Sequence, residues 1–467
     1  MLIRNALVLP GGGDWRPRRA DIAIDGNRIK AVGTELKSVE GKTVDGSDLL
    51  AVPGFVNAHY HSPLSILRGT AEGLSHPAFM WQNQADTAAR TTEEITLSAL
   101  LGGVEMLASG TTAVMDHFPE QGFDVRHVEA VAKAYDTLGM RAAIALRVFD
   151  GAYDDIIPPQ GLPPALARKN PLEPPPLAQT MAVVEEAVDA FHRPQGRVRV
   201  FPAPSNPGRC SDELLVACDD LARRRSLGVH THLLETEVQT RIAEQRYGTT
   251  MVRHMDRLGI LSSRLSCAHT IWIGETDVSL LAERGATVVH NPESNLKIGA
   301  GVMPLPLMRR LGLRVALGTD GASTNDNLVL HEAMRLALII HRPGERDRRR
   351  WLTAADALDM ATVAGAAALQ YADLGTLAPG QLADVVLYDL NDVRWTPCND
   401  PVQQLVFAET GGAVHTVIVD GRVVVEGGRV TTVDASALAR QVRDLLGTIR
   451  GRNRELQSAI DAMLERV

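Results

Sequence analysis

Residues 53–61 read Pro-Gly-Phe-Val-Asn-Ala-His-Tyr-His, and this stretch decides the fold. A Pro-Gly pair stands directly before a short apolar run, which predicts a buried strand that begins there. His59 and His61 are two residues apart at the end of that strand. Because side chains in a strand repeat with a period of two, both imidazoles face the same side and can bind one metal ion. An isolated His-x-His pair often arises by chance, so its meaning depends on the rest of the chain.

Other residues of metal-binding types follow further predicted strands. His232 ends His-Thr-His with Glu235 three residues later, His269 lies in Cys-Ala-His-Thr, and Asp320 lies in Leu-Gly-Thr-Asp-Gly. The carboxyl ends of strands converge in a parallel barrel, which is how such a barrel assembles an active site. Neutral imidazoles and a carboxylate suit a divalent metal such as zinc, and an open coordination position lets the metal activate water.

The individual roles have alternatives at this level. We expect His232 rather than His230 to bind metal, although the reverse is a weaker alternative. Glu235 is a candidate proton carrier, but a carboxylate there also favours the dipole of a following helix. His269 is either a fourth ligand or a group that orients water. Asp320 suits a ligand that also acts as a base, whereas an isolated Thr-Asp-Gly is usually only a turn.

Three further residues near predicted strand ends are weaker candidates. His290 in Val-Val-His-Asn-Pro-Glu and His117 in Met-Asp-His-Phe would reach the same barrel mouth and contact substrate, or they are ordinary core histidines. Cys267 shares a strand face with His269 and so has to be considered as a ligand, but a small core residue is the better interpretation.

The chain divides into a β region, a strand–helix region and a second β region. Residues 1–53 contain short alternating strands, with a hairpin predicted at Asp25-Gly26-Asn27. Residues 54–375 alternate apolar strands with helical stretches, which predicts βα units around a parallel sheet. Residues 376–430 return to alternating strands, and residues 431–467 are predicted to contain a charged outer helix over 436–465. We infer one small β domain built from both chain ends, and a proline-rich loop over 156–176 that is a lid or a surface insertion.

Composition limits the classes of partner. A net charge of −8 over 467 residues gives no basic surface for nucleic acid or anionic membrane. No apolar stretch is long enough to cross a bilayer, and the N-terminal residues do not resemble a signal peptide. Four cysteines without a CxxC pair indicate free thiols in a reducing compartment. We therefore expect a cytoplasmic protein with a small-molecule substrate.

Five stretches taken together resemble the amidohydrolase superfamily, in its aminohydrolase and chlorohydrolase branch. They are Pro53–His61, His230–Glu235, Ala268-His269, His290–Asn295 and Leu317–Asn325. This branch includes deaminases of guanine, methylthioadenosine and S-adenosylhomocysteine, and s-triazine hydrolases. The resemblance covers nearly the whole chain and implies an α/β fold: a distorted TIM (β/α)8 barrel with a small β-sandwich from both chain ends.

The resemblance also implies a site. One divalent metal, zinc with iron or manganese as alternatives, would be bound by His59, His61, His232 and Asp320. Glu235, His269 and Asp320 would be catalytic. No lysine stands at the fourth strand end to bridge two metals, which favours a mononuclear site. A homo-oligomer is also implied.

One departure from the methylthioadenosine and S-adenosylhomocysteine deaminases concerns substrate binding. Those enzymes place a glutamate for the ribose hydroxyls after the segment that corresponds to His61–Leu74. This chain has Trp81–Ala88 there, without a glutamate, although Gln84 or Asp86 is a possible substitute. The departure favours a smaller aminated ring over a nucleoside.

The expected reaction is hydrolytic deamination of an aminated N-heterocycle of purine, pterin, pyrimidine or s-triazine type. Hydroxide formed on the metal attacks the amino-bearing ring carbon, Glu235 protonates the ring nitrogen, and ammonia leaves. In an alternative, chloride, an alkylamine or a cyclic-amide nitrogen is the leaving group at the same site. A non-catalytic binding protein is a third possibility, but a degenerate member should have lost ligands, and here all are present.

Overall fold

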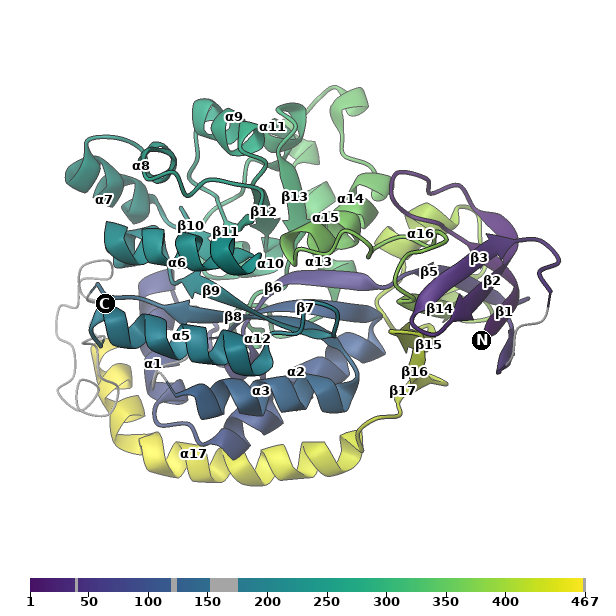
Figure 1. Cartoon of the computed structure of the whole chain (residues 1–467), viewed down its shortest axis with the longest axis horizontal. Helices are drawn as coiled ribbons and strands as arrows, with labels where there is room; N and C mark the ends of the chain where they lie inside the picture. Colours follow the sequence, from purple (N-terminus) through teal and green to yellow (C-terminus); the bar gives the residue numbers. More distant parts are fainter. Residues whose placement is uncertain (38–40, 119–123, 152–174, 465–467) are drawn as a thin grey trace.

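The computed structural model describes residues 1–37, 41–118, 124–151 and 175–464. Two parallel sheets of four strands form its centre, and helices cover them on the outside (Figure 1). The first sheet runs β6-β7-β8-β9 and the second β10-β11-β12-β13. The strands are β6 (Phe55–Tyr60), β7 (Thr111–Phe118), β8 (Arg141–Val148), β9 (Val198–Pro204), β10 (Val229–Leu233), β11 (Leu265–His269), β12 (Thr287–His290) and β13 (Arg314–Leu317). Together with the helices between them, they form a fold of TIM-barrel type.

The two sheets adjoin at both of their edges. Beyond β9, the carbonyl of Ser205 accepts a hydrogen bond from the backbone N–H of His232 in β10. At the other edge, the carbonyl of His59 in β6 accepts from the N–H groups of Thr319 and Asp320, which follow β13. These bonds join the sheets at the carboxyl ends of their strands, where the candidate site residues lie.

Helices surround the strands in chain order. They are α1 (His76–Thr87), α2 (Thr92–Ala108), α3 (Val125–Leu138), α5 (Leu177–Phe191), α6 (Asp212–Arg225), α7 (Glu237–Tyr247), α8 (Met251–Arg257), α9 (Glu275–Glu283), α10 (Pro292–Lys297), α11 (Leu305–Arg310), α12 (Ala322–Asn325), α13 (Leu330–Ile339), α14 (Ala354–Ala361) and α15 (Val363–Ala368). Short 3-10 turns are η1 (Ser62–Leu67), η3 (Pro207–Arg209), η4 (Arg342–Gly344), η5 (Arg348–Arg350) and η6 (Val393–Trp395). Local sequence explains several boundaries: Thr91 and Glu94 form a capping box before α2, and Ser211 caps α6.

The small domain contains one sheet of nine strands, in the order β17-β16-β15-β14-β5-β1-β2-β3 with β4 beside β1. Its strands are β1 (Leu2–Val8), β2 (Arg18–Asp25), β3 (Arg28–Gly33), β4 (Thr43–Asp45), β5 (Leu49–Pro53), β14 (Val385–Asp389), β15 (Val414–Val419), β16 (Arg422–Glu426) and β17 (Arg429–Val430). Both ends of the chain contribute strands to this sheet, as predicted. The two groups of strands are joined through β5, which pairs with β1 on one edge and with β14 on the other.

Alternation along β5 shows how the small domain packs. Leu50 and Val52 belong to the large core shared with the barrel, whereas Leu49 and Ala51 belong to a separate core inside the small domain. Arg141 at the start of β8 adds a polar link, because its buried guanidinium binds Asp384 and Asp420. The small domain is therefore tied to the barrel by both apolar and ionic contacts.

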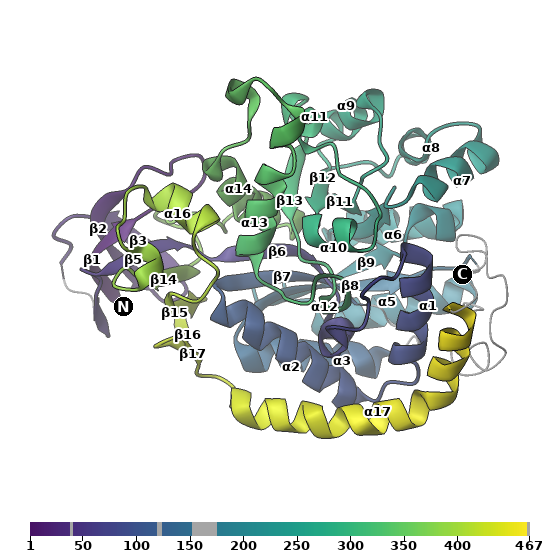
Figure 2. The same cartoon turned by 180° about the vertical axis from the view of Figure 1, so that it is seen from behind.

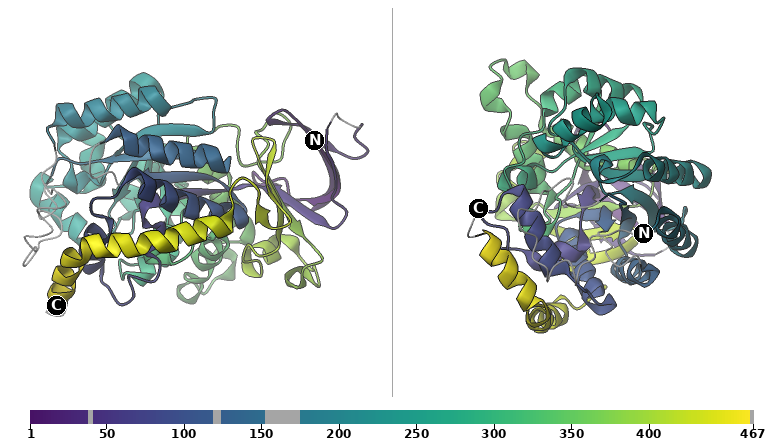
Figure 3. Two further views of the ribbon diagram at one scale, coloured as in Figure 1. Left: turned by 90° about the horizontal axis from the view of Figure 1, so that it is seen from below. Right: turned by 90° about the vertical axis from the view of Figure 1, so that its left-hand side faces the viewer.

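The C-terminal helix α17 (Ala435–Leu464) runs along the outside of the barrel (Figures 2 and 3). It packs on α2 and α1, and its apolar side chains meet those of η1, which directly follows His61. A helix in this segment was predicted. Among the helices that were not predicted individually are α1, whose polar residues hide any apolar stripe, and α16 (Pro401–Phe407), which lies between strands of the small domain. Residues 156–174 of the expected proline-rich loop lie outside the described residues. Within the described ranges, no helix combines the length and apolarity required to cross a membrane.

Candidate metal centre and catalytic pocket

Four histidines converge at the carboxyl ends of the barrel strands. His59 lies one residue before the end of β6 and His61 just beyond it, His232 lies in β10, and His269 ends β11. The ligand atoms of His59, His61 and His232 lie within 4.8 Å of one another, and so do those of His59, His269 and Asp320. Nε2 of His59 and Nε2 of His61 lie 3.4 Å and 3.2 Å from Oδ1 of Asp320. The residues that the sequence placed in one site are thus brought together.

Each of these imidazoles is fixed through Nδ1, which leaves Nε2 for the centre. Nδ1 of His61 bonds the carbonyl of His117 at 2.6 Å, and Nδ1 of His232 bonds that of Ser205 at 2.7 Å. Because a carbonyl only accepts, both Nδ1 atoms carry a proton, and in the neutral ring this leaves the lone pair on Nε2. Nδ1 of His269 is held by the side chain of Asn295 at 2.8 Å. Partners of this kind orient metal-binding histidines in proteins.

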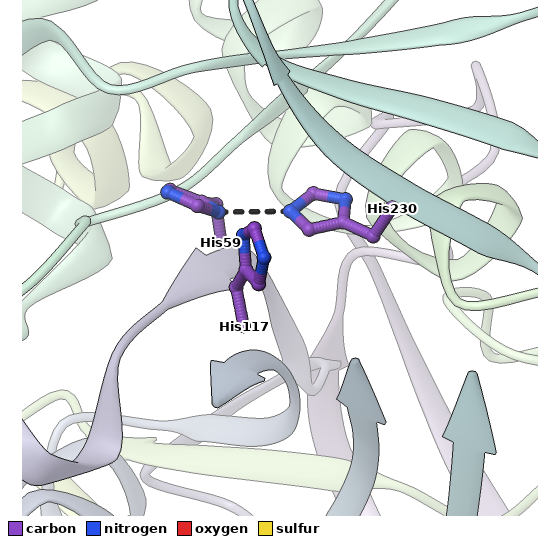
Figure 4. A group of neighbouring side chains, drawn as sticks. All are labelled: His59, His117 and His230. Atoms are coloured by element: carbon purple, nitrogen blue, oxygen red, sulfur yellow. Dashed lines mark hydrogen bonds between the residues drawn. The ribbon is translucent and has the colours of Figure 1, made fainter. Parts of the chain in front are cut away.

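His59 is held by a second histidine rather than by the backbone. Its Nδ1 lies 2.8 Å from Nε2 of His230 (Figure 4). Nδ1 of His230 in turn lies 2.7 Å from Oγ of Ser266. The Ser266 hydroxyl donates to the carbonyl of Val229. His230 therefore bonds to His59 through Nε2, whereas His232 belongs with His59 and His61 to one group of converging ligand atoms.

The group of His59, His230 and His117 in Figure 4 does not form a metal site of its own. Two nitrogens bound to one zinc at about 2.0–2.1 Å in a tetrahedral site lie more than 3 Å apart. The His59–His230 separation of 2.8 Å is instead that of a hydrogen bond. His117 is fully buried beside them, and its side chain is absent from the pocket wall.

Asp320 is held so that one carboxylate oxygen stays available. Ser294 donates to Oδ2 at 2.6 Å, while Oδ1 faces His59 and His61. The nearby histidines lower the pKa of Asp320 well below its usual range despite burial, so it is ionised. Its backbone has φ of +58°, in the left-handed region that non-glycine residues rarely adopt. His269, at φ +69°, shares this feature, and such strain often occurs at functional sites.

The electrostatics favour neutral ligands and a charged proton carrier. Burial, followed by the neighbouring histidines, lowers the pKa of His232 to about 3, and burial lowers that of His59 well below its ordinary value. Burial alone would raise the pKa of Glu235, but the adjacent His269 and His76 lower it overall. At neutral pH His59 and His232 can therefore donate lone pairs, and Glu235 is ready to accept a proton.

The residues present fit a divalent cation. Nε2 of His59 is buried and makes no hydrogen bond among the described residues, although an unpaired buried polar atom is costly. The donors are imidazole nitrogens and one carboxylate oxygen, a set that suits zinc. Cys267 belongs to none of the groups of converging ligand atoms among the described residues, and burial raises the pKa of its thiol to about 12.

A pocket opens above this centre. Three groups of residues line it. The centre contributes His61, His232, Glu235, His269 and Asp320, and α1 contributes His76, Phe79, Met80, Asn83, Gln84 and Thr87. Other segments contribute Leu64, Arg147, Ser205, Asn206, Arg209 and Gln239. Gln84 is thus part of the wall. His290 and His117 are buried and do not line this pocket.

The sequence interpretation missed several residues of the site. His76 lies 3.3 Å from Glu235, and Gln239 accepts from the backbone N–H of Glu235. The i,i+4 spacing of Glu235 and Gln239 at a helix start was a usable signal, whereas nothing in the sequence marked His76. Arg147 in β8 and Arg209 in η3, which follows β9, are part of the wall and lie near the ring of Phe149.

Comparison with known proteins gives a consistent result. A profile of the amidohydrolase family matches residues 50–424. The chain is 33% identical to 5-methylthioadenosine/S-adenosylhomocysteine deaminase of Thermococcus sibiricus, over 91% of this chain and 93% of that protein. It is 32% identical to 5'-deoxyadenosine deaminase of Methanothermobacter thermautotrophicus, over 93% and 95%.

Solved structures resemble the whole fold. Atrazine chlorohydrolase from Arthrobacter aurescens, crystallised with zinc, superposes with a TM-score of 0.88 at 26% identity, over 95% of this chain and 99% of that one. An adenosine deaminase from Xanthomonas campestris with bound zinc superposes with a TM-score of 0.86 at 27% identity, over 97% and 98%. The similarity therefore includes the small domain as well as the barrel.

Proposed function

The chain belongs to the amidohydrolase family and is a hydrolase of carbon–nitrogen bonds other than peptide bonds, and we propose that it deaminates an aminated N-heterocycle with the help of one divalent metal ion, for which zinc is our first choice. The observation that carries this proposal is the common direction of the imidazoles. His59 and His61 turn Nε2 toward Oδ1 of Asp320, and the ligand atom of His232 lies within 4.8 Å of those of His59 and His61; each of the three rings has Nδ1 already bonded. A structural core would not require four polar residues in this arrangement.

These four residues would hold the metal, which when bound lowers the pKa of water and so makes a nucleophile available near neutral pH. The chain's own task is to orient the substrate and to move protons. His269 faces the same space with Nδ1 fixed by Asn295, so its Nε2 can bind the incoming water or the atom under attack. Asp320 can assist as a base, since its free oxygen adjoins the same space.

Glu235 is the group that can carry a proton from water to substrate. The attacking water loses a proton to Glu235 as its oxygen bonds to the amino-bearing carbon. Glu235 then gives that proton to the ring nitrogen, the carbon–amino bond breaks, and the amino group leaves as ammonia with a second proton from the water. The ionised state of Glu235 suits the first step, because a base must be unprotonated before it acts.

The wall of the pocket bears on the choice of substrate. The helix α1 presents Asn83, Gln84 and Thr87 there, and no glutamate from α1 lines the space. A ribose with two hydroxyls therefore lacks the charged acceptor that a glutamate would provide, which favours a free heterocycle with small substituents. The two deaminases named above act, by their names, on adenosine derivatives, so nucleosides belong in any test.

A second candidate function is hydrolysis of a halogenated or alkylamino s-triazine at the same site. It is favoured by the superposition on atrazine chlorohydrolase over nearly the whole chain. The two candidates differ in leaving group and in product, so one screen separates them.

That screen measures ammonia and chloride release by zinc-loaded protein. The panel contains guanine, 8-oxoguanine, adenine, cytosine, pterins, methylthioadenosine, S-adenosylhomocysteine, 5'-deoxyadenosine, amino-s-triazines and atrazine. Ammonia from a free base supports the proposal in full, and ammonia from a nucleoside alone overturns the preference for small rings. Chloride or alkylamine without ammonia supports the second candidate. No product from any compound, with zinc bound, contradicts both.

A further inference from the structure

His76 contacts the catalytic carboxylate from the opposite side to the metal centre. Its Nε2 lies 3.3 Å from Oε2 of Glu235, while Oε1 of the same carboxylate lies 3.8 Å from Nε2 of His269. His76 and Glu235 are both largely buried and both line the pocket. Glu235 is therefore held between two imidazoles, one beside the metal centre and one from the pocket wall.

The imidazole of His76 is delivered by α1, of which it is the first residue. The far end of this helix is fixed to α17: Gln457 donates to the carboxylate of Asp86, and the buried side chain of Asn453 donates to the carbonyl of Ala88. Gly69 and Gly73, both with positive φ, lie in the segment between η1 and α1. The contact with Glu235 is thus the point at which the N-terminal end of α1 meets the catalytic machinery.

Charge and burial support an attractive contact at this point. Burial by itself lowers the pKa of His76, but the charge of Glu235 and the hydrogen bond to it raise the pKa overall. An N–H donated to a carboxylate is stronger than a bond between neutral groups. It also limits rotation of the Glu235 side chain, which otherwise has three flexible torsions.

We propose that His76 is a positioning residue: by donating to Oε2 of Glu235 it keeps Oε1 directed at the metal centre, and it closes α1 over the bound substrate. This inference rests on the proposed function of Glu235 as proton carrier. Because a misplacement of about 1 Å can reduce a rate by about 100-fold, loss of the bond should affect turnover more than substrate binding.

The kinetic test compares H76L, H76Q and H254Q. H76L removes the donor, whereas the amide N–H of H76Q can still reach the carboxylate. H254Q is the matched control, because His254 also contacts a carboxylate from a helix, that of Asp212 at 2.7 Å, but lies outside the pocket. We expect H76L to lower kcat between about 10-fold and 100-fold with KM changed less than about threefold. H76Q should recover most of the loss, and H254Q should match the wild type.

Either of two kinetic results overturns the inference. One is wild-type kcat in H76L. The other is a change confined to KM that H76Q does not restore, since that would mean a purely structural role. Zinc content is measured for each variant, and H76L is expected to retain the wild-type amount because His76 is not among the ligands.

A second readout does not depend on turnover. Hydrogen exchange of the α1 amides is measured by mass spectrometry in wild type, H76L, E235L and the double variant. If the contact holds α1 closed, each single variant speeds exchange in the first turns of α1, and the double variant adds nothing further. Additive effects, or no effect of E235L on α1, overturn the inference. If this experiment shows the contact while the wild type is inactive on every substrate, the proposed function fails and the contact stands. If the wild type is active and H76L has the same kcat, the proposed function stands and the inference about His76 fails.

Discussion

Nδ1 of His59 and Nε2 of His230 lie 2.8 Å apart at the bottom of the metal centre. The direction of the hydrogen bond between these two atoms follows from the groups on either side of the pair. If Nε2 of His59 is to present a lone pair, its Nδ1 must carry the proton and donate to His230. His230 then donates to Ser266, which donates to the carbonyl of Val229. A chain of hydrogen bonds from the β10 backbone thus sets the tautomer of a ligand.

The first prediction removes this support. In H230A, Nδ1 of His59 loses its acceptor, and we expect zinc affinity to fall between about 10-fold and 100-fold, the effect typical of losing a group that orients a ligand. Competition with a chromophoric chelator measures the affinity, and H254A provides the control. Unchanged affinity in H230A would mean that the relay does not set the tautomer. Loss as large as that of H59A would make His230 a ligand.

The second prediction concerns Glu235. E235Q keeps the shape and the pocket but cannot take a proton, so zinc content should match the wild type while kcat falls by about 100-fold to 10,000-fold. The zinc content and the rate are measured on the same preparation. A rate near that of the wild type would remove Glu235 from the proposed role, and loss of zinc would make it part of the metal site instead.

The alternation of strands and helices could be predicted from the sequence, because each barrel strand is a short apolar run between turn signals. The alternation predicted over residues 54–375 is observed, for example where α3 (Val125–Leu138) is followed by β8 (Arg141–Val148). His59, His61, His232 and Asp320 could be grouped because strand ends converge in a parallel barrel. That argument uses only local pattern and topology.

Three features depend on contacts between distant segments and so were not predictable. The contact of His76 with Glu235 joins α1 to β10 across the pocket, and no local pattern signals it. The role of His230 depends on the 2.8 Å approach of another strand. The small domain has one continuous sheet because β5 pairs with strands from both chain ends. The alternation of apolar and polar residues identifies strands but does not show which strands pair with one another.

The third prediction concerns the buried ion pair between the two domains. Arg141 binds Asp384 through two nitrogens, and each side chain is only 1% exposed. In R141M the carboxylate of Asp384 stays buried without its partner, so we expect stability to fall by about 3–5 kcal/mol. Urea denaturation measures it. R16M is the matched control, because Arg16 pairs with Asp14 at the surface, where water and salt screen the interaction and such pairs contribute little. Equal effects of R141M and R16M would show that the buried pair is no stronger than the surface one.

The fourth prediction is that acid destabilises the metal-free protein partly through His331. This histidine is buried against Phe55 and bonded to the hydroxyl of Tyr388, and burial lowers its pKa to about 3 from an ordinary value of 6.5. Below pH 6.5 the unfolded chain takes up the proton first, whereas the folded chain does so only near pH 3. Stability therefore falls as the pH decreases through this range, by about 2 kcal/mol for this one group between pH 8 and pH 5.

H331Q tests this prediction, because glutamine can still bond to Tyr388 but does not titrate. At pH 8 His331 is neutral in both the folded and unfolded states, so the difference between variant and wild type there reports packing alone. The loss of stability from pH 8 to pH 5, measured by urea denaturation, should be smaller in H331Q by about 2 kcal/mol. An equal loss in both proteins would mean that His331 is protonated in the folded state with little cost, and that the acid sensitivity lies with other buried histidines such as His290, whose pKa burial also lowers to about 3.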